Sequence, residues 1–197
     1  KYTTTKIKWN TNIYCMAYKD QLILTGHQDN VGNPIRSNSE KSYRLGLEID
    51  AAITISKQFS MTPNITLNQN KNVDLNVDGT NLGNKDISYS PSIVAGNIFI
   101  YKPSENFQMS LLSKFVGQQY LNNIELNEAK LPDYFVNNLN VSYQIKPKSI
   151  FKSIIFSALF NNIFDKSYIA NGYMYDVTPY YYPQAGRNFL GGVILKF

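Results

Sequence analysis

Few residues of this chain have the chemistry for catalysis or metal binding, and they gather in polar stretches. The single histidine, His27, stands two residues before Asp29. Two serines, Ser37 and Ser39, follow in the same stretch. A serine, a histidine and an aspartate form a hydrolytic triad only where the fold holds them in hydrogen-bond contact, and nothing in this spacing fixes that geometry. One histidine with one aspartate is also too few ligands for a zinc site. We therefore predict no catalytic residue, no metal site and no cofactor.

A second polar stretch has oxygen-bearing side chains at alternate positions. Asp74, Asn76 and Asp78 are followed by Gly79, an arrangement loosely similar to a calcium-binding loop. The residues between them are apolar: Val73, Leu75 and Val77. That pattern favours a plain alternation of polar and apolar residues, with calcium binding in an outer loop as the alternative.

The stretch from 173 to 182 is rich in tyrosine. Tyrosine offers rigid, amphipathic contact area of the kind that binding surfaces use. The same side chains also anchor proteins at the headgroup level of a membrane or pack one loop against another. The candidate ligand-binding residues in this stretch are Tyr173, Tyr175, Tyr180, Tyr181 and Tyr182.

Composition limits the kind of protein further. The one cysteine, Cys15, excludes an intrachain disulfide and a cysteine-based zinc cluster. The net charge of +5 comes from scattered lysines with only three arginines, so we expect no nucleic-acid surface. Charged residues make up 17% of the chain, below the usual quarter for soluble domains, while aromatic residues reach 14%.

The polar stretches lie between segments in which apolar and polar residues alternate, the period of a β-strand. The clearest segment, 42–56, carries seven apolar side chains on one face and Arg44, Glu48 and Asp50 on the other. It is long enough to cross a bilayer, which takes about 9–11 residues of tilted strand. The eight segments expected to be strands are 7–18, 42–56, 61–70, 92–101, 107–118, 135–146, 153–168 and 189–197.

The connections between these segments alternate in length. Short turns are expected at 57–60, 102–106 and 146–149. Long polar loops are expected at 19–41, 71–90, 121–132 and 170–183. Short turns at one end and long loops at the other are typical of antiparallel up-and-down transmembrane β-barrels, whose inner ends face the periplasm.

Two kinds of closed barrel have two-faced strands: a soluble barrel with an apolar interior and a membrane barrel with an apolar exterior. The polar faces here are rich in Asn, Gln, Ser and Thr and use charge sparingly. The apolar faces carry no Lys or Arg near their centres, where either would cost about 2–4 kcal/mol in lipid. These features favour the membrane barrel, with outer-membrane lipid around it. Its interfacial aromatic girdle would include Trp9, Tyr18, Tyr43, Tyr101, Tyr120, Tyr134 and Tyr168.

The last segment ends on an aromatic residue. It resembles the signal by which bacterial outer-membrane barrels are delivered to their assembly machinery. The residues that carry this resemblance are Phe189, Gly192, Leu195 and Phe197. We expect this strand to be structural and to engage the assembly machinery rather than a ligand.

Three motifs together resemble the C-terminal end of TonB-dependent outer-membrane receptors. Residues 161–168, Asn-Asn-Ile-Phe-Asp-Lys-Ser-Tyr, resemble the family's penultimate-strand signature, in which Asn161, Asn162 and Asp165 would cap the backbone of a loop. Residues 182–189, Tyr-Pro-Gln-Ala-Gly-Arg-Asn-Phe, resemble the start of its last strand. Upstream, residues 31–33 followed by Gly46-Leu47-Glu48 resemble a stretch leading into an earlier strand, with Leu47 where Val is usual.

The resemblance implies a 22-stranded barrel around an N-terminal plug domain in the bacterial outer membrane. Such receptors import scarce, bulky ligands (iron-siderophores, cobalamin, haem or glycans) with energy that TonB delivers through an N-terminal region. It implies that residues 1–197 are about eight C-terminal strands of the barrel, without the plug, and that this is not an enzyme. It further implies that Phe197 is a natural end and Lys1 is not a natural start.

Two other functional classes stay open on the sequence. One is a complete, small eight-stranded outer-membrane barrel with a structural or adhesive role. The other is a hydrolase embedded in a barrel, for which the residues offer little support.

Overall fold

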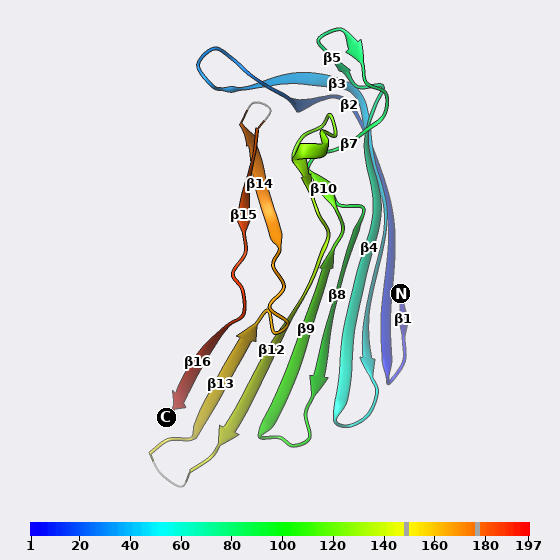
Figure 1. Cartoon of the computed structure of the whole chain (residues 1–197). Coiled ribbons are helices and arrows are strands. Elements are labelled where there is room, and N and C mark those ends of the chain that lie inside the picture. The colour runs from blue at the N-terminus through cyan, green and yellow to red at the C-terminus, as the bar shows by residue number, and fades with distance from the viewer. Residues whose placement is uncertain (148–149, 176–177) are drawn as a thin grey trace.

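The computed structural model describes residues 1–147, 150–175 and 178–197. It consists of one large antiparallel sheet, whose strands run between a row of short turns at one end and long hairpins and loops at the other (Figure 1). The alternating segments of the sequence form the strands because one face of each is apolar and the other polar.

Consecutive strands lie side by side across the sheet, each antiparallel to its neighbours. They are β2 (Ile7–Gln28), β3 (Pro34–Thr54), β4 (Phe59–Val73), β8 (Ile93–Tyr101), β9 (Phe107–Val116), β12 (Tyr134–Ile145), β13 (Ser153–Asn161) and β16 (Asn188–Lys196). Two short strands join them: β1 (Tyr2–Thr3) pairs with the start of β2, and β7 (Lys85–Asp86) with the end of β4. The predicted all-β, up-and-down architecture is confirmed, and each predicted segment corresponds to one strand. Over the described residues the sheet is open, with β1 and β16 at its edges.

The register of the strands gives the sheet one apolar and one polar face. Ile13, Leu47 and Leu67 are cross-strand partners in one row, and Asn12, Glu48 and Thr66 are partners in the next. Large residues of the apolar face are open to the surroundings: Ile13 is 74% exposed and Phe135 52%. A sheet that exposes its apolar side chains is what a lipid-facing wall requires. No helix in the described part of the chain is long and apolar enough to cross a membrane.

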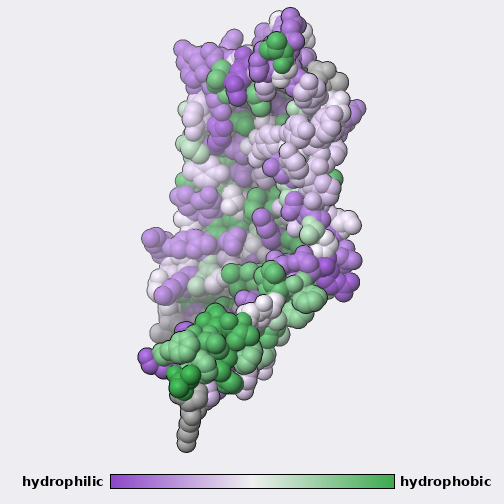
Figure 2. Space-filling view, turned by 90° about the vertical axis from the view of Figure 1, so that its left-hand side faces the viewer, coloured by the Kyte–Doolittle hydropathy of each residue, from purple (hydrophilic) through white to green (hydrophobic). Residues whose placement is uncertain are grey.

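The apolar surface is concentrated toward the end with the short turns. Figure 2, which views the molecule from the side of β15 and β16, shows hydrophobic residues gathered over the lower part of this side. Hydrophilic residues cover its upper part, where the hairpins and loops lie. An apolar band below polar loops agrees with the predicted placement of a barrel wall in a membrane.

One aromatic ring compensates for a missing side chain on the polar face. Tyr14 of β2 is the cross-strand partner of Gly46 in β3. A Cβ atom built on Gly46 would lie only 2.3 Å from the Cζ atom of Tyr14, so the ring covers the glycine backbone. An aromatic side chain over a glycine restores the packing that the glycine lacks and fixes the register of the pair.

The short turns are confirmed where the structure describes them. Between β3 and β4, the Ser56 hydroxyl accepts hydrogen bonds from the backbone N–H groups of Gln58 and Phe59, both at 3.2 Å. The predicted turn at 102–106 joins β8 and β9. In the third predicted turn, at 146–149, residues 148 and 149 lie outside the described part of the chain.

The predicted loop at 19–41 is wrong, because β2 and β3 continue as a paired hairpin through this stretch. Its turn is closed by Asp29, whose Oδ1 atom accepts the N–H groups of Val31 at 2.9 Å and Asn33 at 2.8 Å. The Asn33 side-chain amide also donates to Oδ2 at 3.0 Å. Hydrogen bonds from the side chain and the backbone of Asn33 lower the pKa of the Asp29 carboxyl. A short polar turn thus replaces the expected loop.

The predicted strand at 153–168 is too long. β13 ends at Asn161, and Asn162 follows with a positive φ of 49°. The Asn162 side chain accepts the N–H group of Lys166 at 2.9 Å and donates to the Lys166 carbonyl at 2.9 Å. Asp165, also at positive φ, accepts the N–H group of Arg187 at 2.7 Å. The expected capping is confirmed for Asn162 and Asp165, and it is what ends the strand. It is wrong for Asn161, which stays in β13 and donates from its side-chain amide to Oδ1 of Asn188 at 2.8 Å.

The other predicted loops contain structure of their own, above the sheet. They hold β5 (Asn76–Val77), β6 (Thr80–Asn81), β10 (Gln119–Tyr120), the 3₁₀ helix η1 (Asn127–Ala129), β11 (Lys130–Leu131), β14 (Ile169–Tyr175) and β15 (Thr178–Pro183). Two small apolar clusters stabilise them. One joins Ile23 of β2 to Leu75 and Val77. The other joins Leu121, Ala129 and Leu131.

A third cluster corrects the predicted aromatic girdle. Tyr134 is 8% exposed and packs with Val116 and Val136, on the polar side of the sheet. The segment after β13 folds over it, so that the ring of Tyr168 lies 4.7 Å from the ring of Tyr134. These two tyrosines therefore pack inside the molecule, whereas Tyr101 stacks on Phe59 at 4.6 Å on the apolar face.

Candidate ligand-binding site

The tyrosine-rich stretch forms the hairpin of β14 and β15. Tyr173 is the cross-strand partner of Tyr180. Their rings are stacked, with centroids 5.2 Å apart and an interplanar angle of 14°. The ring of Tyr182 lies 5.8 Å from that of Tyr173. Because alternate residues of a strand share a face, Tyr175 lies on the same side. We call these four residues the tyrosine face; each is exposed.

The fifth predicted residue, Tyr181, lies on the opposite side of the hairpin. Its hydroxyl donates a hydrogen bond of 2.5 Å to the carbonyl of Glu128 in η1. On the same side, Met174 packs against the cluster of Leu121, Ala129 and Leu131. This side holds the hairpin to the neighbouring loop, so Tyr181 is an anchor of the hairpin. Residues 176 and 177, at the tip of the stretch, lie outside the described residues.

A cavity of about 240 Å³ lies beside the tyrosine face. It is lined by Leu24, His27, Gln28, Pro34, Tyr89, Leu121, Asn122, Tyr173 and Met174. These residues come from the β2–β3 hairpin, the loop before β8, the loop after β10, and β14. Figure 1 shows the tip of the β2–β3 hairpin reaching over the β14–β15 hairpin. A Cβ atom on Gly32 in that tip would lie 3.6 Å from the Tyr175 hydroxyl.

Tyr89 connects this cavity to the hairpin. Its hydroxyl donates a hydrogen bond of 3.2 Å to the carbonyl of Gly172 in β14. Partial burial of the side chain, which is 42% exposed, together with the neighbouring Tyr182, raises the pKa of Tyr89 above the ordinary value of 10.0. Nothing in the sequence pointed to Tyr89, because its partner is 83 residues away.

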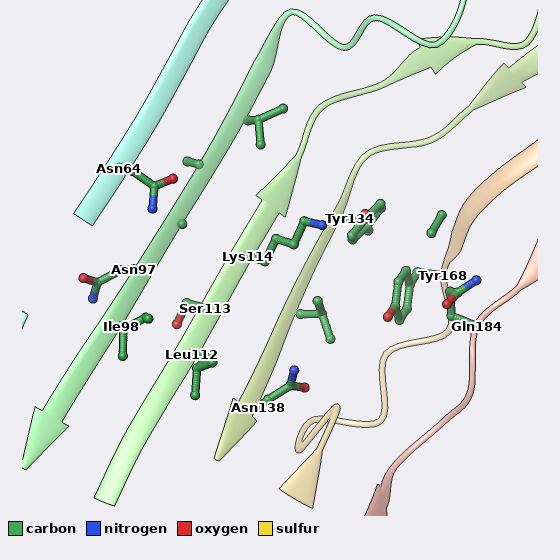
Figure 3. Close-up of a pocket in the computed structure, with 15 residues that line it drawn as sticks. Asn64, Asn97, Ile98, Leu112, Ser113, Lys114, Tyr134, Asn138, Tyr168 and Gln184 are labelled. Carbon is green, nitrogen blue, oxygen red and sulfur yellow. The ribbon is translucent and has the colours of Figure 1, made fainter. Parts of the chain in front are cut away.

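A second hollow, of about 480 Å³, lies over the polar side of β8, β9 and β12 (Figure 3). Asn64, Gly96 and Lys114 form one cross-strand row beneath it. Since Gly96 has no side chain, the row leaves room between the other two. The Tyr134 and Tyr168 rings form the upper wall, and Figure 3 shows the Lys114 side chain reaching toward Tyr134. This hollow offers one cation and several neutral polar groups to whatever lies against the sheet.

The terminal strand places its predicted residues on two faces. Phe189 and Leu195 are the cross-strand partners of Phe160 and Ile154 on the apolar face. Gly192 lies on the polar face, where a Cβ atom would be 2.9 Å from the hydroxyl of Ser157. The ring of Phe197 packs against Phe151 at 5.0 Å. These are structural contacts, as expected; engagement of the assembly machinery stays a prediction.

The residues considered for hydrolysis are not brought together. Asp29 closes the β2–β3 turn, and the Nε2 atom of His27 lies 3.5 Å from the Oδ2 atom of Asp78. The Ser39 hydroxyl donates to the carbonyl of Lys41 at 3.1 Å. In the stretch considered for calcium, Leu75 and Val77 are buried, as the alternation favoured. Within residues 1–147, 150–175 and 178–197, no group of three or more His, Cys, Asp or Glu side chains could hold a metal ion.

Comparison with known proteins gives different answers for sequence and structure. No protein-family model and no curated protein matches the sequence. The structure is similar to the ferric yersiniabactin uptake receptor FyuA from Yersinia pestis, with a TM-score of 0.73 and 17% identity over 100% of this chain and 28% of FyuA. It is similar to the siderophore receptor PiuA from Acinetobacter baumannii, with a TM-score of 0.73 and 14% identity over 98% of this chain and 26% of PiuA. The copper transporter OprC gives a TM-score of 0.71 and 17% identity over 98% of this chain and 29% of OprC.

These similarities define the class of fold. The chain has the fold of the barrel wall of TonB-dependent receptors, as its sequence motifs indicated. It spans about a quarter of the length of the receptors that it matches.

Proposed function

We propose that this chain is part of the barrel of a bacterial outer-membrane receptor that imports a scarce, bulky ligand with energy supplied through TonB. The observation that carries the proposal is the two-faced, up-and-down sheet, which superposes over its whole length on an uptake receptor. Its apolar face is exposed as a lipid-facing surface would be. The similar structures are transport receptors, which supports a role that is not enzymatic.

The partners of the proposed receptor follow from this placement. Outer-membrane lipid covers the apolar face, and the remaining strands of the barrel pair with the edges of the sheet. A plug domain lies against the polar face, and TonB acts through a region N-terminal to the barrel. The assembly machinery engages β16. The alternative of a complete small barrel finds no support in the pairing, since β1 and β16 each have a single partner strand over the described residues.

Within this receptor, the tyrosine face is our candidate for ligand contact. Its four side chains come from a hairpin that is fixed from behind by Tyr181 and Met174. Rigid aromatic side chains on a fixed support lose little conformational entropy on binding. The stacked rings of Tyr173 and Tyr180 cover one face of each other and leave their edges and hydroxyl groups open. A ligand with oxygen acceptors fits such a surface, and the similar receptors and transporter carry ferric siderophores and copper.

Uptake by cells tests the proposal. Cells would express the protein as encoded in its genome, as the sole receptor of its class, and be offered a panel of ⁵⁵Fe-loaded siderophores and ⁶⁴Cu complexes. We expect saturable uptake of at least one compound, abolished when TonB is deleted, with the protein in the outer-membrane fraction. A protein recovered in the soluble fraction, or uptake that does not depend on TonB, would overturn the proposal.

A further inference from the structure

A polar pocket interrupts the upper part of the sheet, apart from the tyrosine face. β4 and β8 pair upward as far as Leu67 and Ile93, and β8 and β9 as far as Val94 and Val116. Above this level the segment before Ile93 runs between the end of β4 and the start of β10. A pocket of about 300 Å³ lies in this gap. It shares no lining residue with the cavity beside the tyrosine face.

All ten residues that line the pocket are polar: five side-chain amides, three hydroxyl groups and one ion pair. The amides belong to Asn68, Gln69, Asn70, Gln118 and Gln119. Ligand pockets are usually lined mostly by apolar side chains. An apolar ligand here would leave many donors and acceptors without partners, which opposes binding. The lining therefore selects a polar ligand.

The charges of the pocket cancel. Its one cation, Lys71, and its one anion, Asp86, form an ion pair with 2.6 Å between Nζ and Oδ1. Burial alone would lower the pKa of Lys71, but the hydrogen bond to Asp86 and the charges of Asp86 and Glu125 raise it. The ammonium group thus stays charged and paired. An anionic or cationic ligand would have to compete with a partner already in place, so a neutral ligand is favoured.

One wall of the pocket is fixed and the other is free to bind. On the β4 side, the Asn70 amide donates to Asn68 at 2.6 Å, and the Tyr43 hydroxyl donates to Gln69 at 3.0 Å. On the opposite side, the side chains of Gln118 and Gln119 have no hydrogen-bond partner in the described part of the chain. Each of these amides can donate and accept at once, as neighbouring sugar hydroxyls require.

We propose that this pocket, which Tyr120 also lines, binds a neutral sugar residue held by the amides of Gln118 and Gln119. An amide-rich lining matches the alternating donors and acceptors of a sugar ring. A volume of about 300 Å³ fits one ring rather than a bulky ligand. This site is additional to the proposed transport function and does not depend on it.

The test uses the protein as encoded, purified in detergent and applied to an array of neutral and acidic oligosaccharides. A sugar that binds is then titrated by calorimetry. In the double variant Gln118→Leu/Gln119→Leu, which keeps side-chain size, we expect affinity to fall about tenfold or more. The matched control is Gln58→Leu, in the turn between β3 and β4, which should change affinity less than about twofold. Heat-modifiable migration on gels reports whether each variant is folded.

The outcomes separate the proposal from its alternatives. Saturable binding of a neutral sugar that the double variant loses supports it. The source is then identified by comparing core oligosaccharide released from lipopolysaccharide with free oligosaccharides such as maltotriose. Binding of acidic sugars only, binding unchanged in the double variant, or no binding to the wild type would overturn the proposal. None of these results depends on uptake, so they leave the transport function to its own test.

Discussion

The hydroxyl group of Tyr89 donates a hydrogen bond to the carbonyl oxygen of Gly172, at 3.2 Å, across 83 residues of sequence. It joins the loop before β8 to the strand that carries Tyr173. Together with the bond from Tyr181 to Glu128, it holds the β14–β15 hairpin at two points. The position of the tyrosine face therefore depends on residues that belong to other loops.

We expect Tyr89→Phe to loosen this hairpin without unfolding the sheet. The variant loses one hydrogen bond but keeps the ring, so the cost is about 0.5–1.5 kcal/mol. Limited proteolysis of intact cells should cleave the 170–183 segment faster than in the wild type. The control is Tyr2→Phe, whose ring is exposed at the edge of the sheet. Equal cleavage in the two variants would show that the Tyr89 bond does not hold the hairpin.

Alkaline pH should act on the same contact. Burial and the nearby Tyr182 raise the pKa of Tyr89, so the folded state keeps this proton at a pH where the unfolded state has lost it. The stability of the folded state therefore falls as pH rises from about 10 through the raised pKa, and is unaffected below that window. Spectrophotometric titration of the tyrosines should show a late component that Tyr89→Phe makes smaller. If the late component were equally large in the variant, the raised pKa would not belong to Tyr89.

The tyrosine face and its anchor should respond differently to mutation. We expect Tyr180→Ala/Tyr182→Ala to lower ligand uptake by about tenfold or more, as loss of aromatic contact residues does at other interfaces, and to leave the hairpin resistant to protease. Tyr181→Phe should make the hairpin more sensitive to protease, because it removes the bond to Glu128, and should lower uptake less than the double variant does, because the four side chains of the tyrosine face remain. Normal uptake by the double variant would exclude the tyrosine face as the ligand contact.

The pair of Tyr14 and Gly46 predicts a mutational rescue. Gly46→Ala would place a Cβ atom 2.3 Å from the Tyr14 ring, so the ring must move, at a cost of about 1–3 kcal/mol. The double variant Gly46→Ala/Tyr14→Ala removes the clash and should recover part of that loss. Urea unfolding in lipid vesicles would measure both. If the double variant were less stable than the sum of the two single effects predicts, the clash would not be the cause.

The sequence allowed the strands to be predicted because their alternation is a local property. The alternation of apolar and polar residues alone assigns Leu47 to the apolar face and Glu48 to the polar face. The pairing of β3 with its neighbours only aligns these faces across the sheet. The hairpin at 19–41 was missed because its polar composition is that of a loop. A single side chain, Asp29, folds the chain back there, and its effect depends on hydrogen bonds within five residues rather than on hydrophobic period.

The candidate site could be predicted only in part. The tyrosines were visible as a cluster, but their division into a face and an anchor depends on the register of β14 and β15. Tyr181 is the cross-strand partner of Gly172 and lies on the opposite face of β15 from Tyr180 and Tyr182. Tyr89 and Gln119 reach their pockets through contacts between distant loops, which no local pattern encodes.

The separation of anchor from face bears on how such a protein changes over generations. Tyr181 and Met174 fasten the hairpin from one side, while Tyr173, Tyr175, Tyr180 and Tyr182 point to the other. Substitutions among those four alter what the hairpin touches and leave its attachment unchanged. In a receptor of the proposed kind, lineages could therefore change ligand preference one residue at a time, without passing through a form that fails to assemble.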